Sequence, residues 1–253
     1  MQENDKTGIQ LRDVAVALSL LTRVPLRLPD AAFARGAAAS WAWPLAGLVP
    51  GTLAALAGQL CLGAGAGFAA VMALAASVIV TGAMHEDGLA DVADGFWGGW
   101  DRARRLEIMK DSRIGAYGVM ALILGFAARW SALSVLLASG GGAWALLGVA
   151  MLSRAGMPAL MCWLPNARAN GLSQSTGRPS APVAGLAVAV ALIGAGLCLG
   201  VSVLPVAVMI AAVVLCLGLI ARAKIGGQTG DVLGASQQLA EIAGLGVLAA
   251  LWA

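Results

Sequence analysis

Uncharged apolar runs recur along the chain, and several reach or approach the roughly 20 residues that a helix needs to cross a bilayer core. Charged residues make up 11% of the chain. Soluble domains typically carry about 25%. The sequence therefore predicts an all-α, polytopic integral membrane protein, with residues 1–253 forming a single membrane-embedded domain.

About seven spans are predicted. Their approximate bounds are 41–62, 68–84, 114–137, 143–164, 183–203, the run that follows the turn at Leu204-Pro205 and ends at residues 222–224, and 232–252. Trp41 and Trp43 suit the membrane interface at the start of the first span. Residues 11–24 are too short to span and end at a Val-Pro step, which predicts an interfacial helix.

Neither a leader nor a cysteine-based site is expected. Glu3 and Asp5 replace the basic-then-apolar pattern of a cleavable signal peptide. The four cysteines lie in or beside apolar segments without C-x-x-C spacing, so neither a disulfide framework nor a zinc site is indicated.

The distribution of Lys and Arg predicts the orientation. The turns after the first, third and fifth spans carry none, whereas the N-terminal segment and the other loops carry nearly all of them. By the positive-inside rule the N-terminus is cytoplasmic and the C-terminus is outside. The acidic segment, the 166–180 loop and the 226–231 loop should then converge on one cytoplasmic rim.

Residues 84–113 concentrate the charge of the chain and form its candidate catalytic segment. Seven of the thirteen acidic residues lie here, together with five of the sixteen basic ones. If the second helix continues into this segment, Asp87, Asp91 and Asp94 stand at i, i+4 and i+7 on one stripe. Three stacked like charges need a cation, and Mg²⁺ prefers carboxylate and phosphate oxygens. A chain with one histidine cannot build a His-rich zinc or iron site.

Cations suited to phosphate oxygens follow the acidic stripe. We assign substrate or phosphate contacts to Arg104, Arg105, Lys110, Arg113, Arg178 and Asp231. Glu107 and Asp111 form a further i, i+4 carboxylate pair that could reach the same metal. Carboxylates for a metal beside cations for phosphate indicate phosphoryl or nucleotidyl transfer. The alternatives left open are a merely solvated charged loop and, for Asp231, a helix cap.

Three charges lie inside predicted spans, where ionisable residues are costly. Arg154 and Glu241 lie near mid-span and could pair, whereas Arg129 could reach the outer interface beside Trp130. No catalytic role is assigned to them, and Glu86 is given no necessary role.

The run H-E-D-G-L-A-D-V-A-D-G-F-W-G-G, followed by R-R-L-E-I-M-K-D-S-R-I-G-A-Y-G, closely resembles the cobalamin synthase family. The early L-L-T-R-V-P and the late G-G-Q-T-G-D-V-L-G-A also resemble that family, and the resemblance covers essentially the whole chain. It implies an Mg²⁺-dependent enzyme of the bacterial inner membrane with its active site on the cytoplasmic side. The implied reaction joins adenosylcobinamide-GDP to α-ribazole or its 5′-phosphate and releases GMP.

The resemblance also suggests roles for residues. Asp87, Asp91 and Asp94 would hold Mg²⁺ against the diphosphate, and Asp94 or Asp111 would accept the attacking proton. The aromatic residues of 96–100 could line a corrinoid site or lie at the interface. Membrane lipid is an expected partner, nucleic acid is not, and a homo-oligomer is left open.

Two other functions compete with this one. The motif shares part of the D-G-x-x-A-R signature of CDP-alcohol phosphotransferases, but Asp91 stands near the Ala-Arg position and the long spacer before the last aspartates is missing. An ion-coupled transporter would place its carboxylates near the bilayer midplane, often within inverted repeats, and no internal repeat is evident.

Overall fold

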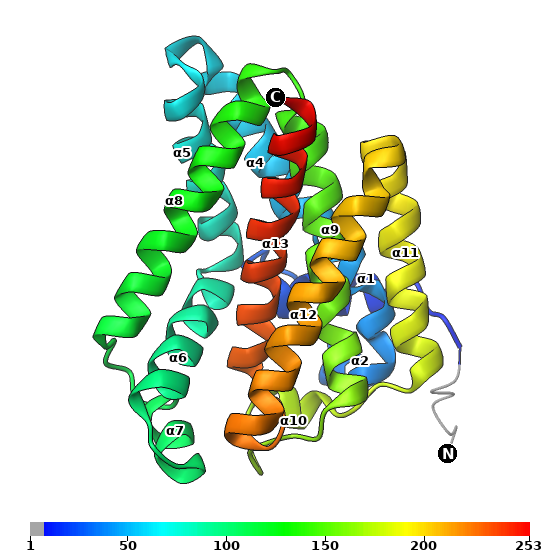
Figure 1. Cartoon of the computed structure of the whole chain (residues 1–253). Helices are drawn as coiled ribbons and strands as arrows, with labels where there is room; N and C mark the ends of the chain where they lie inside the picture. The colour runs from blue at the N-terminus through cyan, green and yellow to red at the C-terminus, as the bar shows by residue number, and fades with distance from the viewer. Residues whose placement is uncertain (1–7) are drawn as a thin grey trace.

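Long apolar helices form the body of the molecule in the computed structural model, which describes residues 8–253 (Figure 1). They are α4 (Leu48–Cys61), α5 (Ala66–Thr81), α8 (Ala116–Ala138), α9 (Gly142–Trp163), α11 (Ala181–Leu199), α12 (Val203–Ile225) and α13 (Gly230–Trp252). Over these described residues there is no β-strand, only an isolated bridge between Asn166 and Gln228. The prediction of an all-α membrane bundle is confirmed. Glu3 and Asp5 lie outside the described part of the chain.

Five helical stretches of the described chain are long and apolar enough to cross a membrane. They are Gly36–Ala64, Ala116–Ala138, Gly142–Trp163, Ala181–Ile225 and Gly230–Trp252. The fourth contains α11 and α12, which turn back on each other at η3 (Gly200–Ser202) (Figure 1). A sixth is added if α5 and α6 (Met84–Gly98) form one broken span. The count of seven and the cytoplasmic side of the N-terminus stay predictions.

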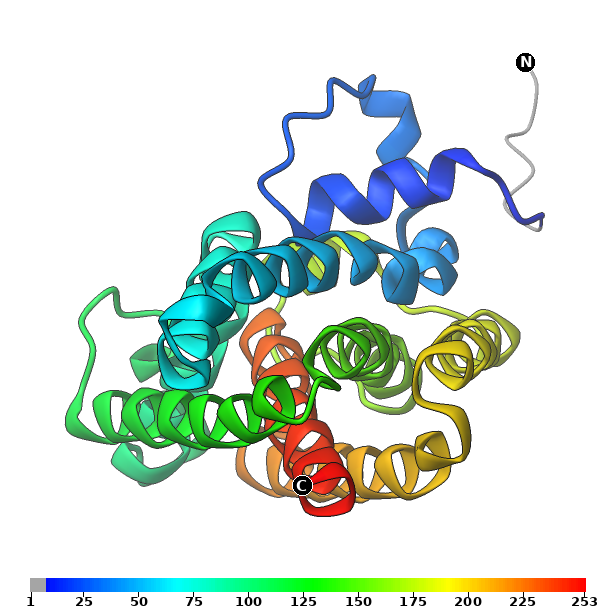
Figure 2. The ribbon, with the colours of Figure 1, turned by 90° about the horizontal axis from the view of Figure 1, so that it is seen from above.

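Helix α9 lies at the centre of the bundle, and α13 runs beside it from the centre towards the edge at which the chain ends (Figure 2). In the most apolar stretch of each helix, 78% of the α9 residues and 67% of the α13 residues are buried, against 22% of the α8 residues. The outer helices thus leave apolar side chains facing outward, as expected where the surrounding solvent is hydrocarbon.

The N-terminal helices pack across the side of the bundle. Helix α1 (Arg12–Leu21) runs across the direction of the long helices (Figure 2), and α2 (Asp30–Phe33), η1 (Gly36–Ala42) and α3 (Trp43–Ala46) follow it. Asp13 holds this region together, because it accepts bonds from Arg35 Nε at 2.6 Å and Trp41 Nε1 at 2.8 Å. A helix within residues 11–24 is confirmed, and its interfacial position stays a prediction. Trp41 and Trp43 are buried in protein, and their predicted place at the membrane interface stays a prediction.

A sharp bend separates α5 from the acidic segment. The two helices meet at 90°, and the break falls at Gly82 and Ala83, whose φ values are +67° and +58°. Left-handed backbone is easy for glycine and costly for alanine, so the surrounding packing must hold this turn. The expectation that the second helix continues straight into the acidic stripe is therefore wrong: the stripe has a helix of its own.

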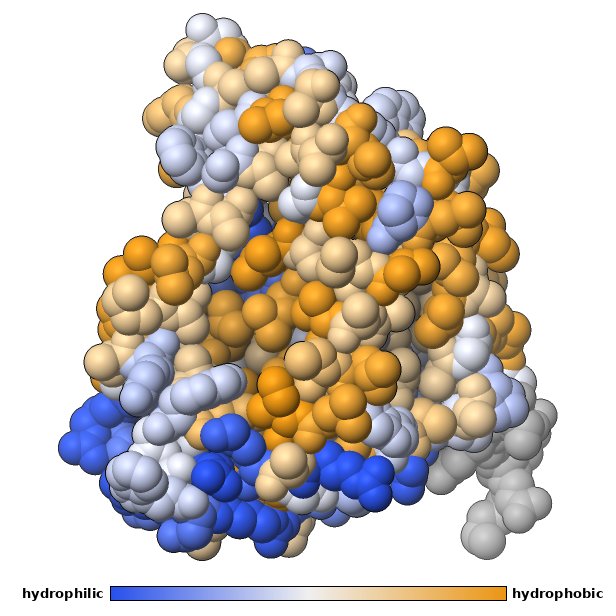
Figure 3. Space-filling view, in the orientation of Figure 1, coloured by the Kyte–Doolittle hydropathy of each residue, from blue (hydrophilic) through white to orange (hydrophobic). Residues whose placement is uncertain are grey.

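Hydrophilic residues gather at one end of the molecule, where α7 (Arg102–Ile108) and α10 (Leu172–Thr176) lie (Figure 3). Two loops meet at this end, because Gln228 N donates to Pro165 O and Ala167 N donates to Gln228 O, both at 2.8 Å. The predicted convergence of the 166–180 and 226–231 loops beside the acidic segment is confirmed.

Candidate active site

The acidic stripe lies on α6 with its side chains in three different environments. Asp87 is exposed, Asp91 is half-buried and Asp94 is buried. Gly88 brings this helix directly onto α13, because a Cβ placed there would lie 3.1 Å from the Cα of Asp231 and 3.2 Å from that of Gly234. This contact between backbones brings Asp231 to the acidic stripe.

A cavity of about 280 Å³ opens beside this contact. Asp87 and His85 line it from α6, and the two converging loops supply most of its polar lining. These polar loop residues are Asn166, Arg168, Asn170, Ser173, Gln174, Thr176, Gln228, Thr229 and Asp231. The cavity therefore joins parts of the sequence that are more than a hundred residues apart.

Negative charge exceeds positive charge at this cavity. Arg168 Nη1 lies 2.9 Å from Asp231 Oδ2, and the Thr229 hydroxyl donates to the same oxygen at 3.2 Å. Burial, together with the charges of Asp231 and Asp87, raises the pKa of Asp91 to about 7, and Arg168 opposes this rise. Two lining carboxylates, Asp87 and Asp231, thus face one guanidinium with Asp91 close by, and a cation or a cationic group of a ligand would relieve their repulsion.

The carboxylates fit Mg²⁺ only together with a substrate. Within residues 8–253 no group of three or more His, Cys, Asp or Glu side chains is arranged to hold a metal ion. Mg²⁺ commonly takes only one or two carboxylates and completes its shell with water and substrate phosphates. Asp87 and Asp91 suit that mode of binding, and the metal role of the stripe stays a prediction.

Asp94 makes a different contact from the one predicted. Its two carboxylate oxygens accept backbone bonds from Gly115 N at 2.7 Å and Gly118 N at 2.9 Å, at the start of α8. Negative charge at the N-terminus of a helix is stabilising, so this contact anchors α8 to α6. The geometry gives Asp94 a structural contact, and its metal and proton-acceptor roles stay untested predictions.

Asp111 lies in a second, open hollow together with Arg104 and Arg113. Arg113 donates to Asp111 and lowers the pKa of that carboxyl from its ordinary value to about 2. Arg104 pairs at 2.8 Å with Glu107. A carboxylate with so low a pKa is a weak proton acceptor at neutral pH, so the geometry does not favour Asp111 as the general base.

Two other residues that were predicted to bind phosphate donate hydrogen bonds to backbone carbonyls instead. Arg105 donates to the carbonyls of Gly99, Trp100 and Lys224, each at 3.0 Å. Arg178 donates to the carbonyl of Cys162 at the end of α9, and Lys110 is exposed. Of the six predicted contacts, Asp231 alone lines the cavity described above.

Apart from Asp231, the polar loop residues that line the cavity were not assigned to the site from sequence. Ser173 Oγ donates to Gln228 Oε1 at 2.7 Å, and Gln228 Nε2 donates to Asn166 Oδ1. Arg168 is the cation that faces Asp231. The available signal was positional: the loops that carry these residues were expected on the same rim as the acidic segment.

The aromatic residues after the stripe separate into two environments. Phe96 is fully buried in the core, so it cannot line a surface site for a corrinoid. Trp97 and Trp100 are exposed, and Lys224 Nζ lies 5.1 Å from the ring centroid of Trp97. A corrinoid contact at these two tryptophans stays a prediction.

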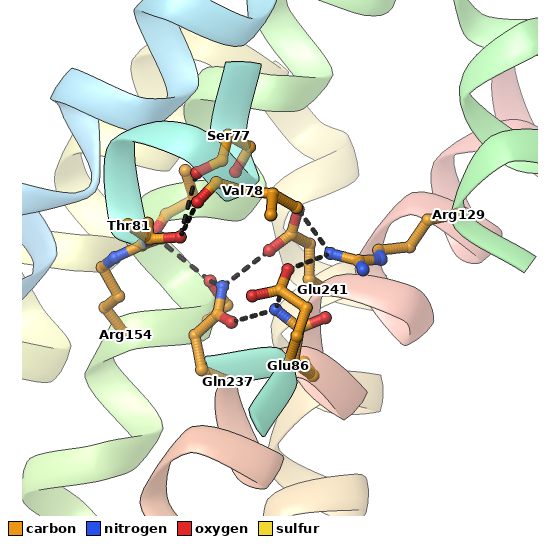
Figure 4. A network of polar contacts seen from close by, with 11 residues as sticks. Ser77, Val78, Thr81, Glu86, Arg129, Arg154, Gln237 and Glu241 are labelled. Atoms are coloured by element: carbon orange, nitrogen blue, oxygen red, sulfur yellow. Dashed lines mark hydrogen bonds and ion pairs between the residues drawn. The ribbon is translucent and has the colours of Figure 1, made fainter. Parts of the chain in front are cut away.

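A buried polar network lies behind the site (Figure 4). Arg129 Nη1 lies 3.2 Å from Glu86 Oε1 and 3.9 Å from Glu241 Oε1. Gln238 Nε2 also donates to Glu86, at 3.1 Å, so the first turn of α6 is held by both α8 and α13. Arg129 is 1% exposed, and its predicted reach to the outer interface is wrong. Glu86, given no necessary role from sequence, is a central member of the network.

Arg154 and Glu241 do not form the predicted ion pair. Arg154 Nη1 donates to the carbonyl of Ala150 at 2.9 Å, whereas the ion-pair partner of Glu241 is Arg129. Gln237 Nε2 donates to Glu241 Oε2 at 2.6 Å. The two arginines and two glutamates still balance one another in charge within one buried region.

Comparison with known proteins decides the family. The family model for cobalamin-5-phosphate synthase matches residues 13–249. The chain belongs to the cobalamin-5-phosphate synthase family. Proteins named adenosylcobinamide-GDP ribazoletransferase are similar to it over nearly their whole length. The one from Bradyrhizobium diazoefficiens is 44% identical, covering 95% of this chain and 94% of its own. That of Mesorhizobium japonicum is 46% identical, covering 92% and 91% respectively.

Membership of the cobalamin-5-phosphate synthase family makes the chain a transferase of cobalamin assembly. A third relative, from Sinorhizobium medicae, is 46% identical over 94% of this chain and carries the same name. No solved structure matches the chain. The resemblance seen in the motifs is confirmed, and neither the CDP-alcohol phosphotransferase nor the transporter interpretation is needed.

Proposed function

We propose that the chain joins adenosylcobinamide-GDP to α-ribazole or α-ribazole 5′-phosphate, giving adenosylcobalamin or its 5′-phosphate and GMP. The ribazole hydroxyl oxygen forms a bond to the phosphorus attached to the cobinamide arm. The bond from that phosphorus to the GMP oxygen breaks, and the hydroxyl loses its proton. The observation that carries this proposal is the cavity at which Asp87, Asp231 and Arg168 meet, in a chain matched to the family over residues 13–249.

In this reaction the main task of the protein is to position the substrates and to neutralise phosphate charge, rather than to form covalent bonds with them. Mg²⁺, when bound, would neutralise diphosphate oxygens and the leaving phosphate. Asp87 and Asp91 are the residues that would hold it. Arg168 would neutralise a phosphate oxygen through its planar pair of donors, and Asp231 holds the guanidinium in place at 2.9 Å. The Asn166–Ser173–Gln228 bonds fix the two loops from which these groups project.

The proposed location is the bacterial inner membrane, with the cavity on the cytoplasmic side. The polar end of the molecule, to which the cavity loops belong, carries the Lys and Arg residues that favour the cytoplasm. Lipid would surround the exposed apolar faces of the outer helices. The mass of the purified protein in detergent would show whether the chain forms a homo-oligomer.

The test is GMP release from adenosylcobinamide-GDP and α-ribazole by purified protein in detergent or liposomes, with and without Mg²⁺. We expect metal-dependent release that falls by about 100-fold or more in Asp91→Asn, as for loss of a charged group in a phosphoryl-transfer site. Glu107→Gln is the matched control, because Glu107 is an exposed carboxylate in the same charged segment. No release by folded wild-type protein would overturn the proposal. Release that survives in Asp91→Asn would place the metal elsewhere.

A further inference from the structure

The cavity beside Asp87 has two kinds of wall. Its polar residues come mostly from the two loops at the end of the bundle. Most of its apolar residues come from α1, α3, α6, α9 and α13, and these are Leu20, Leu21, Trp43, Met84, Met157 and Leu233. Leu172 of α10 adds one apolar side chain on the side of the loops. The pocket therefore combines an apolar wall within the bundle with a polar, charged wall at the loops.

The size of the cavity limits what enters it. Its volume of about 280 Å³ is near the lower end of ligand pockets, which run from about 300 to 1,000 Å³. A bicyclic ring with a ribose is of this scale, whereas a corrinoid macrocycle is several times larger. The cavity can thus enclose the smaller substrate or the nucleoside end of the larger one.

Polarity distinguishes these two nucleosides. Guanine presents amide and amino groups on its edge, and apolar side chains such as Trp43 and Met157 would leave them unpaired at a cost in free energy. The glycosylated benzimidazole ring of ribazole carries no N–H group and is mostly hydrocarbon. Its ribose hydroxyls, by contrast, suit carboxylate acceptors such as Asp87 and Asp231.

We infer that this cavity is the binding site of the acceptor nucleoside, with the benzimidazole against the apolar wall and the ribose at Asp87, Asp231 and Arg168. This inference rests on the proposed function and adds which substrate the cavity receives. The guanosine diphosphate arm then approaches the same carboxylates from outside the cavity.

Leu20→Trp tests the assignment, because this partly buried α1 residue lines the cavity and an indole would fill part of its volume. We expect the KM for α-ribazole to rise about tenfold or more, since a small change of pocket shape discriminates by that order. The KM for adenosylcobinamide-GDP should stay within about threefold, which is less than one kinetic decade. Leu60→Trp is the matched control, because Leu60 of α4 is 85% exposed and does not line the cavity.

A binding measurement on the wild-type protein tests the same inference, and its outcome does not depend on whether the Leu20→Trp variant folds. Equilibrium dialysis of the full chain in detergent, with α-ribazole and without Mg²⁺ or corrinoid, should show saturable binding that excess guanosine does not displace. Displacement by guanosine would overturn the inference. So would a Leu20→Trp protein whose KM rises only for adenosylcobinamide-GDP, or for neither substrate. In those cases wild-type GMP release would leave the proposed function standing, whereas its absence would overturn both.

Discussion

Arg129 is the cation between two buried carboxylates, and Arg129→Met removes its charge while keeping an unbranched apolar side chain. The side chain of Arg129 is 2% exposed, and those of Glu86 and Glu241 are 7% and 9% exposed. The change leaves these two carboxylates with Arg154 as the compensating cation. Removing one partner of a buried ion pair costs about 3–5 kcal/mol. For a chain of this size the melting temperature should fall by roughly 6–20 °C, at about 2–4 °C per kcal/mol.

The assay is thermal unfolding in detergent, followed by differential scanning fluorimetry. The double variant Arg129→Met/Glu86→Gln removes one positive and one negative charge together, so it should recover at least about half of the loss. Arg104→Met is the matched control, because its partner Glu107 is 69% exposed. Surface pairs contribute about 0–1 kcal/mol, so its melting temperature should change little. A melting temperature of Arg129→Met within about 2 °C of wild type, which corresponds to less than about 1 kcal/mol, would refute the charge-balance reasoning. A double variant that is less stable than the single variant would refute it as well.

Three further predictions follow from the contacts of the site. Asp94→Ala removes the carboxylate that accepts hydrogen bonds from the Gly115 and Gly118 amides, and the melting temperature should fall by about 2–8 °C, as for loss of a helix cap of about 1–2 kcal/mol. An unchanged melting curve would contradict the anchoring role of Asp94. Arg168→Gln should lower kcat/KM by about 100-fold in the GMP-release assay, because a charged donor leaves the cavity, and a value near wild type would place the phosphates elsewhere. Asp111→Asn should keep activity within about threefold between pH 6 and 8, because a carboxyl with a pKa of about 2 is ionised throughout that range and makes a weak base; a large loss would restore it as the proton acceptor.

Much of the architecture was predictable because a hydrocarbon solvent leaves a chain few choices. Long apolar runs such as 143–164 and 232–252, each with a single charged residue, can satisfy their backbone groups in a membrane only as helices, and α9 and α13 match these runs closely. The placement of Lys and Arg correctly grouped the 166–180 and 226–231 loops with the acidic segment. The motif residues identified the family before any contact was known.

The residues of the site were less predictable, because helical periodicity shows which residues share one face of a helix but not which other element packs against that face. Asp87 and Asp94 share a stripe, but seven residues advance about 10 Å along a helix. One therefore reaches the cavity and the other reaches the start of α8. The phosphate contacts predicted for the arginines rested on the same local spacing, whereas Arg105 donates to the backbone carbonyls of Gly99, Trp100 and Lys224.

The sequence by itself determined that this chain is a membrane-embedded helical transferase with its charge gathered at one end. Tertiary structure alone decided which charges act together. The bend at Gly82 and Ala83 sets the direction of α6, and the close approach of Gly88 to α13 brings Asp231 and Arg168 to Asp87. Such pairings depend on how backbones pack across more than a hundred residues of chain, and spacing along one helix carries no information about them.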